Sequence, residues 1–282
     1  MIHLIDAIKW AKENITAMPA INIFSLDFMV FIAQFSKRYN WPVIIQTSTK
    51  TVNHYGVPTI VAMFNAIKNH YGAPIFLHLD HCNNIPLINE CIESGYDSIM
   101  ADFSSLPVKE NIREIKRIAD VARSEGCLIE GEVGQLGIED GVGSEVITHT
   151  SVKDALTFTS AGHVSLFAPV FGNAHGNYKS SSPSLDFALF KEIATSVGIP
   201  LVLHGASGLS PVQIKQCIKY GTVKINYSTV FKNIFSELID SNTLLSIKSN
   251  NPLLFNDKLK TAIISELESI YKVLNYNRTT IG

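Results

Sequence analysis

Residues 75–101 read IFLHLDHCNNIPLINECIESGYDSIMA, and this stretch decides the fold. The apolar run Ile75–Leu79 predicts a buried strand, and the spacing of apolar residues over Leu87–Gly95 predicts a helix that closes with a glycine. A second apolar run, Ser98–Ala101, follows the helix. A strand, a helix and another strand in this order are typical of a parallel βαβ unit.

The same alternation runs through most of the chain. Eight apolar runs are predicted as strands: Ala20–Ile23, Val43–Gln46, Ile75–Leu79, Ser98–Ala101, Leu128–Glu132, Val164–Ala168, Leu201–Leu203 and Val223–Asn226. Eight strand-then-helix units predict an α/β fold, a single (β/α)8 TIM barrel that takes residues 1–282 as one domain. An open doubly wound sheet is the competing architecture. Val230–Ile239 and Asp257–Val273 are predicted as extra C-terminal helices that close the barrel or pack on a neighbouring subunit.

Composition excludes several classes of protein. Hydrophobic residues make up 46% of the 282 and charged residues 17%, which argues against general disorder. A formal net charge of -2 lacks the basic excess of a nucleic-acid binder. The four cysteines have no CxxC spacing, so we expect neither a disulfide framework nor a cysteine zinc site, but a reducing, cytoplasmic setting. The charged, amphipathic start is unlike a signal peptide, and no apolar run has the ~18 residues of a membrane helix.

Polar residues collect at the carboxyl ends of the predicted strands, where barrel enzymes carry their chemistry. His81, His175 and His204 each follow a different strand, so closure of the barrel would direct their imidazoles towards one axis. Three protein ligands and an open position suit a catalytic zinc ion. The alternative is three unrelated histidines in a polar rim. Glu132 and Asp102 are candidates for a further ligand or for fixing a histidine ring.

Other motifs surround this predicted centre. Asp80 directly precedes His81, so its carboxylate is either a general base beside a metal or a hydrogen-bond partner of a ligand. The glycine-rich segments 171–176 and 204–208 are either phosphate-binding loops, with Ser207 and Lys179 as donors, or ordinary tight turns. The long segment 134–150 is either a mobile lid or a passive surface loop.

Motifs along nearly the whole chain resemble the class II, zinc-dependent ketose-bisphosphate aldolases, especially the short tagatose-bisphosphate branch. The motifs are Pro19–Asn22 (PAIN), Val43–Ser48 (VIIQTS), Leu77–His81 (LHLDH), Glu130–Gly134 (EGEVG), Gly172–Lys179 (GNAHGNYK), Leu203–Gly208 (LHGASG) and Lys224–Asn226 (KIN). The resemblance implies reversible cleavage of a ketose 1,6-bisphosphate of the tagatose or fructose type into dihydroxyacetone phosphate and an aldehyde such as glyceraldehyde 3-phosphate.

The resemblance also implies roles for individual residues. It makes His81, His175 and His204 ligands of one catalytic Zn²⁺, with Glu132 and Asp102 as accessory acidic positions for a second divalent or monovalent cation. It makes Asp80 the base at the C4 hydroxyl and Glu139 the lid acid that protonates C3, while zinc holds the C2 carbonyl and C3 hydroxyl. Its substrate and phosphate site falls on Asn22, Ser48, Gly176, Lys179, Gly205, Ser207, Asn226, Ser228 and Thr229. The family further implies carbohydrate metabolism such as glycolysis, a small-molecule sugar phosphate as partner, and a homodimer or homotetramer.

The sequence departs from the family pattern on the aldehyde side. Phe103, Tyr227, Ser228 and Val230 replace the residues expected there, and Leu253 stands where the short branch often carries arginine. Two alternatives follow from these departures. One is an aldolase or transferase that joins dihydroxyacetone phosphate to an unusual or unphosphorylated aldehyde, and the other is a non-catalytic aldolase-like subunit.

Overall fold

The structure is a computed structural model that describes residues 2–138, 147–176, 184–239 and 253–274. In this part of the chain, eight parallel strands close into a barrel in the order β1-β10-β9-β7-β5-β4-β3-β2. Their bounds are β1 (Met18–Asn22), β2 (Val43–Ser48), β3 (Ile75–Cys82), β4 (Ser98–Ala101), β5 (Leu128–Val133), β7 (Leu166–Pro169), β9 (Leu201–Leu203) and β10 (Thr222–Tyr227). The predicted TIM barrel is confirmed, and the open sheet is excluded because β1 pairs with both β2 and β10.

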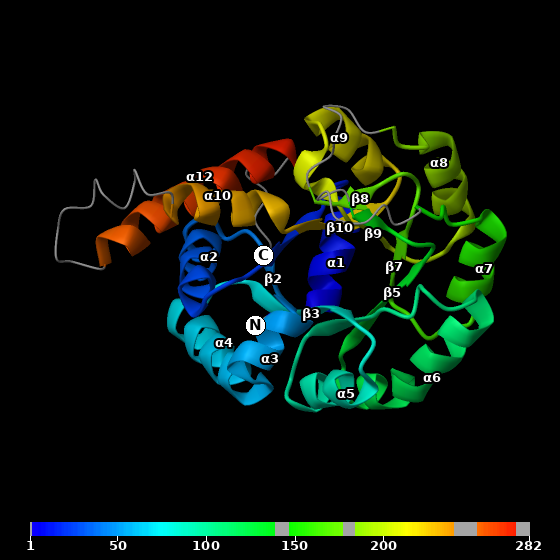
Figure 1. Cartoon of the computed structure of the whole chain (residues 1–282), viewed down its shortest axis with the longest axis horizontal. Helices are drawn as coiled ribbons and strands as arrows, with labels where there is room; N and C mark the ends of the chain where they lie inside the picture. Colours follow the sequence, from blue (N-terminus) through cyan, green and yellow to red (C-terminus); the bar gives the residue numbers. More distant parts are fainter. Residues whose placement is uncertain (1, 139–146, 177–183, 240–252, 275–282) are drawn as a thin grey trace.

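Helices surround the barrel (Figure 1). Their bounds are α1 (Leu4–Glu13), α2 (Leu26–Tyr39), α3 (Thr49–Tyr55), α4 (Val57–Tyr71), α5 (Ile85–Glu93), α6 (Val108–Glu125), α7 (Val152–Ser160), α8 (Phe187–Ser196), α9 (Pro211–Lys219), α10 (Thr229–Ile239) and α12 (Leu253–Val273). Helices α10 and α12 are the predicted C-terminal helices, and α12 packs on α2. The sequence reading missed α3 and α7, and also the two-stranded sheet of β6 (Gly137–Ile138) and β8 (Ala174–His175). None of the described helices combines the length and apolarity that crossing a bilayer requires.

The barrel interior changes from apolar to polar along the strands. Apolar side chains near the strand starts, such as Ile44, Phe76 and Val223, pack with Leu4 and Ile8 of α1. Helix α1 therefore closes the amino-terminal end of the barrel.

Two residues further along the same strands, the buried side chains become polar. These are Gln46 on β2 and His78 on β3. On β10 the buried polar side chain is Lys224, which follows Val223 directly because the pairing with β9 shifts in register at this point. Because side chains alternate in direction along a strand, a step of two keeps the same inward direction. The opposite, carboxyl-terminal end of the barrel is therefore the polar one.

The outer face of the barrel packs against the surrounding helices in a second, larger apolar core. Tyr227 and Phe103 belong to this core, with 4% and 7% of their surfaces exposed. All four cysteines are buried and free.

Candidate active site

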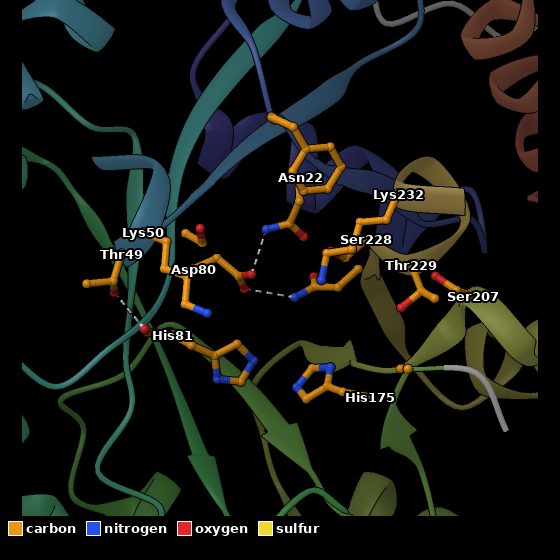
Figure 2. A pocket seen from close by; sticks show the side chains of 15 residues that line it. Asn22, Thr49, Lys50, Asp80, His81, His175, Ser207, Ser228, Thr229 and Lys232 are labelled. Carbon is orange, nitrogen blue, oxygen red and sulfur yellow. Dashed lines mark hydrogen bonds between the residues drawn. The ribbon is translucent and has the colours of Figure 1, made fainter. Parts of the chain in front are cut away.

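A cavity of about 460 Å³ opens at the carboxyl ends of the strands (Figure 2). It is lined by most of the described residues that the sequence assigned to catalysis or substrate binding: Asn22, Ser48, Asp80, His81, His175, Gly176, Gly205, Ser207, Asn226, Ser228 and Thr229. Glu139 and Lys179 lie outside the described residues, as do residues 139–146 of the predicted lid. The structure thus gathers these predicted residues around one space.

A β-bulge in β3 places two consecutive side chains in this cavity. Strand β3 pairs with β4 through Leu79 and Ile99, and then through Cys82 and Ala101, so the register shifts at Asp80–His81. His81 has a φ of 44°, in the left-handed region that residues other than glycine rarely adopt. In a regular strand these neighbours would point to opposite faces. The bulge lets both Asp80 and His81 reach the cavity.

Among the described residues, His81, His175 and His204 form a candidate metal centre. Their ligand atoms all lie within 4.8 Å of one another, and Nε2 of His81 is 3.0 Å from Nδ1 of His204. The outward nitrogens have acidic partners: His81 Nδ1 lies 2.6 Å from Asp102, and His204 Nε2 lies 2.8 Å from Glu130. Carboxylates that hold the outer nitrogens of histidine ligands are typical of metal sites. The donor set fits zinc.

The charges around the histidines favour a cation between them. Burial alone would lower the pKa of His81, but the carboxylates of Asp80, Asp102 and Glu132 outweigh it and raise this pKa to about 10. Burial and the charge of His81 lower the pKa of His175 to about 4. The same two causes, burial first and then the charge of His81, lower the pKa of His204 well below its ordinary value. His175 and His204 are therefore neutral at pH 7, the form in which imidazole binds a metal.

Asp80 is held by two side-chain amides. Asn22 Nδ2 donates to its Oδ2 at 2.8 Å, and Asn226 Nδ2 lies 3.4 Å from its Oδ1. Burial raises the pKa of Asp80, but the charges of His81 and Lys224 and the Asn22 hydrogen bond prevail, so the net pKa is lowered. Asp80 is therefore an ionised carboxylate that can accept a proton from a ligand in the cavity.

Glu132 and Asp102 lie behind the histidines and do not line the cavity. Asp102 bonds to His81 and also accepts hydrogen bonds from the Ser104 backbone and hydroxyl. Glu132 has an oxygen 3.8 Å from Nδ1 of His204, and burial raises its pKa well above its ordinary value. Asp102 thus orients a histidine, and whether either acid also binds a cation stays a prediction.

The loop after β9 requires its glycine. Gly205 has a φ of 70°, and a Cβ there would lie 2.1 Å from the carbonyl oxygen of Ala174 in β8. Asn173 donates to the backbone carbonyl of His204 at 3.2 Å and ties the same two segments together. This close approach sets His175 and Gly176 beside Gly205 and Ser207 at the edge of the cavity.

Sequence reasoning missed several residues of the site. Phe24, Thr49, Lys50 and Lys232 also line the cavity, and Figure 2 shows the two lysines extending into it from opposite sides. Lys50 lies on α3, a helix that was not predicted. Lys232 belongs to a predicted helix, three residues after Thr229, and this spacing was the signal that could have found it.

Among known protein families, residues 3–278 match the model for fructose-bisphosphate aldolase class II. The chain belongs to this family. Class II aldolases are metal-dependent enzymes, so the prediction of such an enzyme is confirmed, and the three clustered histidines are suited to the metal. The tagatose-bisphosphate branch is a finer assignment that this match does not make.

Solved structures of aldolases have the same architecture. A provisionally assigned fructose-1,6-bisphosphate aldolase from Coccidioides immitis is 25% identical, with a TM-score of 0.86 over 97% of this chain and 96% of its own. The YdjI aldolase from Escherichia coli K12 is 24% identical, with a TM-score of 0.86 over 100% of both chains. The fructose-bisphosphate aldolase from Campylobacter jejuni is 24% identical, with a TM-score of 0.82 over 96% of this chain and 94% of its own. The last two likenesses show the fold alone.

Proposed function

We propose that this class II aldolase catalyses reversible aldol cleavage of a ketose 1,6-bisphosphate, of the tagatose or fructose type. The products would be dihydroxyacetone phosphate and an aldehyde such as glyceraldehyde 3-phosphate. One observation carries the proposal: an ionised Asp80, held by Asn22 and Asn226, lines the same cavity as His81 and His175. A base beside a metal centre is what proton abstraction from a sugar hydroxyl requires.

Three histidines would hold the metal. We assign His81, His175 and His204 as ligands of one Zn²⁺, with Asp102 and Glu130 fixing two of the rings. Bound there, zinc would supply a Lewis acid that withdraws electrons from the ketose carbonyl. Glu132 and Asp102 remain our candidates for a second cation, because both are acidic and lie beside the histidines.

Asp80 would act on the C4 hydroxyl. Its carboxylate accepts the hydroxyl proton, the C4 oxygen forms the aldehyde carbonyl, and the electrons of the C3–C4 bond remain on the dihydroxyacetone-phosphate half. The amides of Asn22 and Asn226 would aim the carboxylate, and the Asn22 hydrogen bond helps to lower its pKa. Protonation at C3 is assigned to Glu139 from the family resemblance.

The C1 phosphate would bind on the side of Ser207 and Thr229. The amino terminus of α10 begins at Thr229, and its first backbone N–H groups suit an anion. Gly176 and Gly205 allow a close approach of backbone to the phosphate, and Lys232 adds a positive charge. Lys179 is a further donor in this proposal, on the family resemblance.

Lys50 favours a second negatively charged group, on the half of the substrate that becomes the aldehyde. Figure 2 shows Lys50 on the side of the cavity opposite Ser207 and Thr229, with Asp80 between them. Ser48, two residues before Lys50, also lines the cavity. A lysine there favours a phosphorylated aldehyde over an uncharged one. Most of the unusual residues bear little on this choice, since Tyr227 and Phe103 pack in the outer core and Leu253 begins α12, with 64% of its surface exposed.

The activity is tested by incubating the zinc-loaded protein with fructose-, tagatose- and sedoheptulose-bisphosphates. We expect release of dihydroxyacetone phosphate from at least one of them. A coupled reductase assay measures this release. The rate with each sugar identifies the preferred configuration at C4. No release from any of the three by protein that carries a stoichiometric metal would overturn the proposal.

Other properties implied by the family remain proposals. We propose a role in carbohydrate metabolism such as glycolysis, a cytoplasmic location, and a homodimer or homotetramer. The four free cysteines support a reducing setting.

A further inference from the structure

Lys224 is a lysine with 0% of its surface exposed, in the polar layer beneath the cavity. Its Nζ donates to Oδ1 of Asn226 at 2.7 Å and lies 2.9 Å from Oε2 of Glu130. Glu130 is also fully buried, and its other oxygen lies 2.8 Å from Nε2 of His204. One ammonium group therefore contacts both the residue that holds Asp80 and the residue that holds His204.

The chemistry of these groups fixes their orientation. A lysine side chain has donors and no acceptor, so only the carbonyl oxygen of the Asn226 amide can face it. The amide nitrogen must then point the other way, and it lies 3.4 Å from Oδ1 of Asp80. Without Lys224, the amide could rotate by a half-turn and present an oxygen to a carboxylate.

The same ammonium fixes the Glu130 carboxylate. A buried carboxylate without a positive partner is costly, and it relieves that cost by taking up a proton or by shifting. Lys224 holds one oxygen of Glu130, which leaves the other free to accept from the His204 ring. The ring nitrogen Nδ1 of His204 then faces His81 and the centre of the histidine cluster.

We infer that Lys224 is a positioning residue of this aldolase, one that sets the amide of Asn226 against the base and the carboxylate of Glu130 against a metal ligand. The inference rests on the proposed roles of Asp80 and His204. It goes beyond those roles because Lys224 does not line the cavity and makes no described hydrogen bond to the histidines. The orientation of the base Asp80 and that of the metal ligand His204 would then both depend on the charge of Lys224.

The test uses the full-length protein with Lys224→Met, which keeps the side-chain length and removes the charge. Partners that orient metal ligands typically contribute 10–100-fold to metal affinity or activity. We expect kcat to fall within this range with a much smaller change in KM, and zinc affinity, measured by competition with a chromophoric chelator, to weaken similarly. Lys68→Met is the matched control. Lys68 Nζ lies 3.9 Å from Oδ1 of Asp97, and neither residue lines the cavity.

A double variant separates positioning from folding. Lys224→Met leaves Glu130 without its partner, so Tm should fall, and adding Glu130→Gln removes the unpaired charge. We expect the double variant to regain most of the lost Tm but not kcat, because the Asn226 amide still lacks its donor. If kcat returns together with Tm, Lys224 is only structural. Wild-type kcat and zinc affinity in Lys224→Met would equally overturn the inference.

Failure of the proposed reaction is distinguishable from failure of this inference. If wild-type protein cleaves no ketose bisphosphate, the proposed function fails. The zinc titration still compares wild type with Lys224→Met, and an unchanged affinity would refute the coupling to His204 without any assay of turnover.

Discussion

Asn22 donates a 2.8 Å hydrogen bond to Asp80 from a strand that is not its neighbour in the barrel. Gln46, on the intervening strand β2, donates in turn to the Asn22 oxygen at 3.1 Å. Because Gln46 holds the oxygen, the Asn22 nitrogen is directed at the carboxylate. The carboxylate that we propose as the proton acceptor is therefore oriented by its neighbours in the absence of substrate.

Removing the carboxylate should abolish most turnover. For Asp80→Ala we expect a loss of about 10²–10⁴-fold in kcat, the contribution typical of a general base. Zinc content and Tm should stay close to wild type, since Asp80 does not belong to the histidine cluster. Steady-state cleavage, metal analysis and thermal unfolding measure the three quantities. Near-normal cleavage would assign the base to another residue.

Loss of the Asn22 hydrogen bond should change the pH dependence. This bond helps to lower the pKa of Asp80, so Asn22→Ala should raise that pKa. Activity requires the ionised form, and the acid limb of the kcat/KM profile should move to higher pH. Asn14→Ala, at an exposed amide that bonds to the Trp10 carbonyl, serves as the control. An unmoved acid limb would mean that Asn22 does not tune the base.

Removal of the metal should abolish activity, and substitution of a clustered histidine should abolish metal binding. Purified without chelator, the protein should carry about one zinc ion per chain, as a three-ligand catalytic site does. Dialysis against a chelator should stop cleavage and zinc should restore it. His175→Ala should lose the metal, whereas His163→Ala, which follows α7 outside the cluster, should keep it. Full activity with no bound divalent metal would contradict the zinc assignment.

Lys50 should act on one half of the substrate. A hydrogen bond to a charged group is worth roughly 1.5–3 kcal/mol, so Lys50→Met should raise KM for glyceraldehyde 3-phosphate in the condensation direction by about tenfold or more. Inhibition by dihydroxyacetone phosphate alone should change little, because we propose that this half binds on the opposite side of the cavity. Lys232→Met should show the reverse pattern. Equal effects of both variants on both halves would refute this division.

Gly205→Ala should destabilise the site and the fold. The substitution combines a left-handed backbone with a Cβ 2.1 Å from the Ala174 oxygen, and strain of the backbone alone costs on the order of 1–3 kcal/mol. We expect a lower Tm and weaker zinc binding, because β8 and His175 must move. Gly198→Ala is the matched control, since a Cβ there meets no atom within 4 Å. If both variants unfold at the same temperature, the close contact has no energetic weight.

The barrel and its cluster of histidines were accessible from the sequence, because apolar strand runs and polar strand ends depend on local pattern. Glu130 and Lys224 lie within the sequence motifs, but the motifs alone predict no role for them. A charged residue inside a strand has a meaning only once its partner on another strand is known. Helix α3 was missed because its seven residues, Thr49–Tyr55, contain a single buried side chain, Val52, and so lack the apolar periodicity of a core helix. Lys50 was missed with it.

The bulge in β3 also has a mechanical consequence. Asp80 and His81 share one distorted point of backbone, which β2 and β4 grip on either side. When the barrel fluctuates, we expect the proposed base and the proposed metal ligand to move together, because they are adjacent in the chain and paired to both neighbouring strands. Thermal motion around the mouth would then change how fast sugars enter and leave, with little change in the distance between these two side chains. Deleting one residue at this bulge would turn either Asp80 or His81 away from the cavity. We expect such a deletion to reduce activity more than a substitution of either side chain.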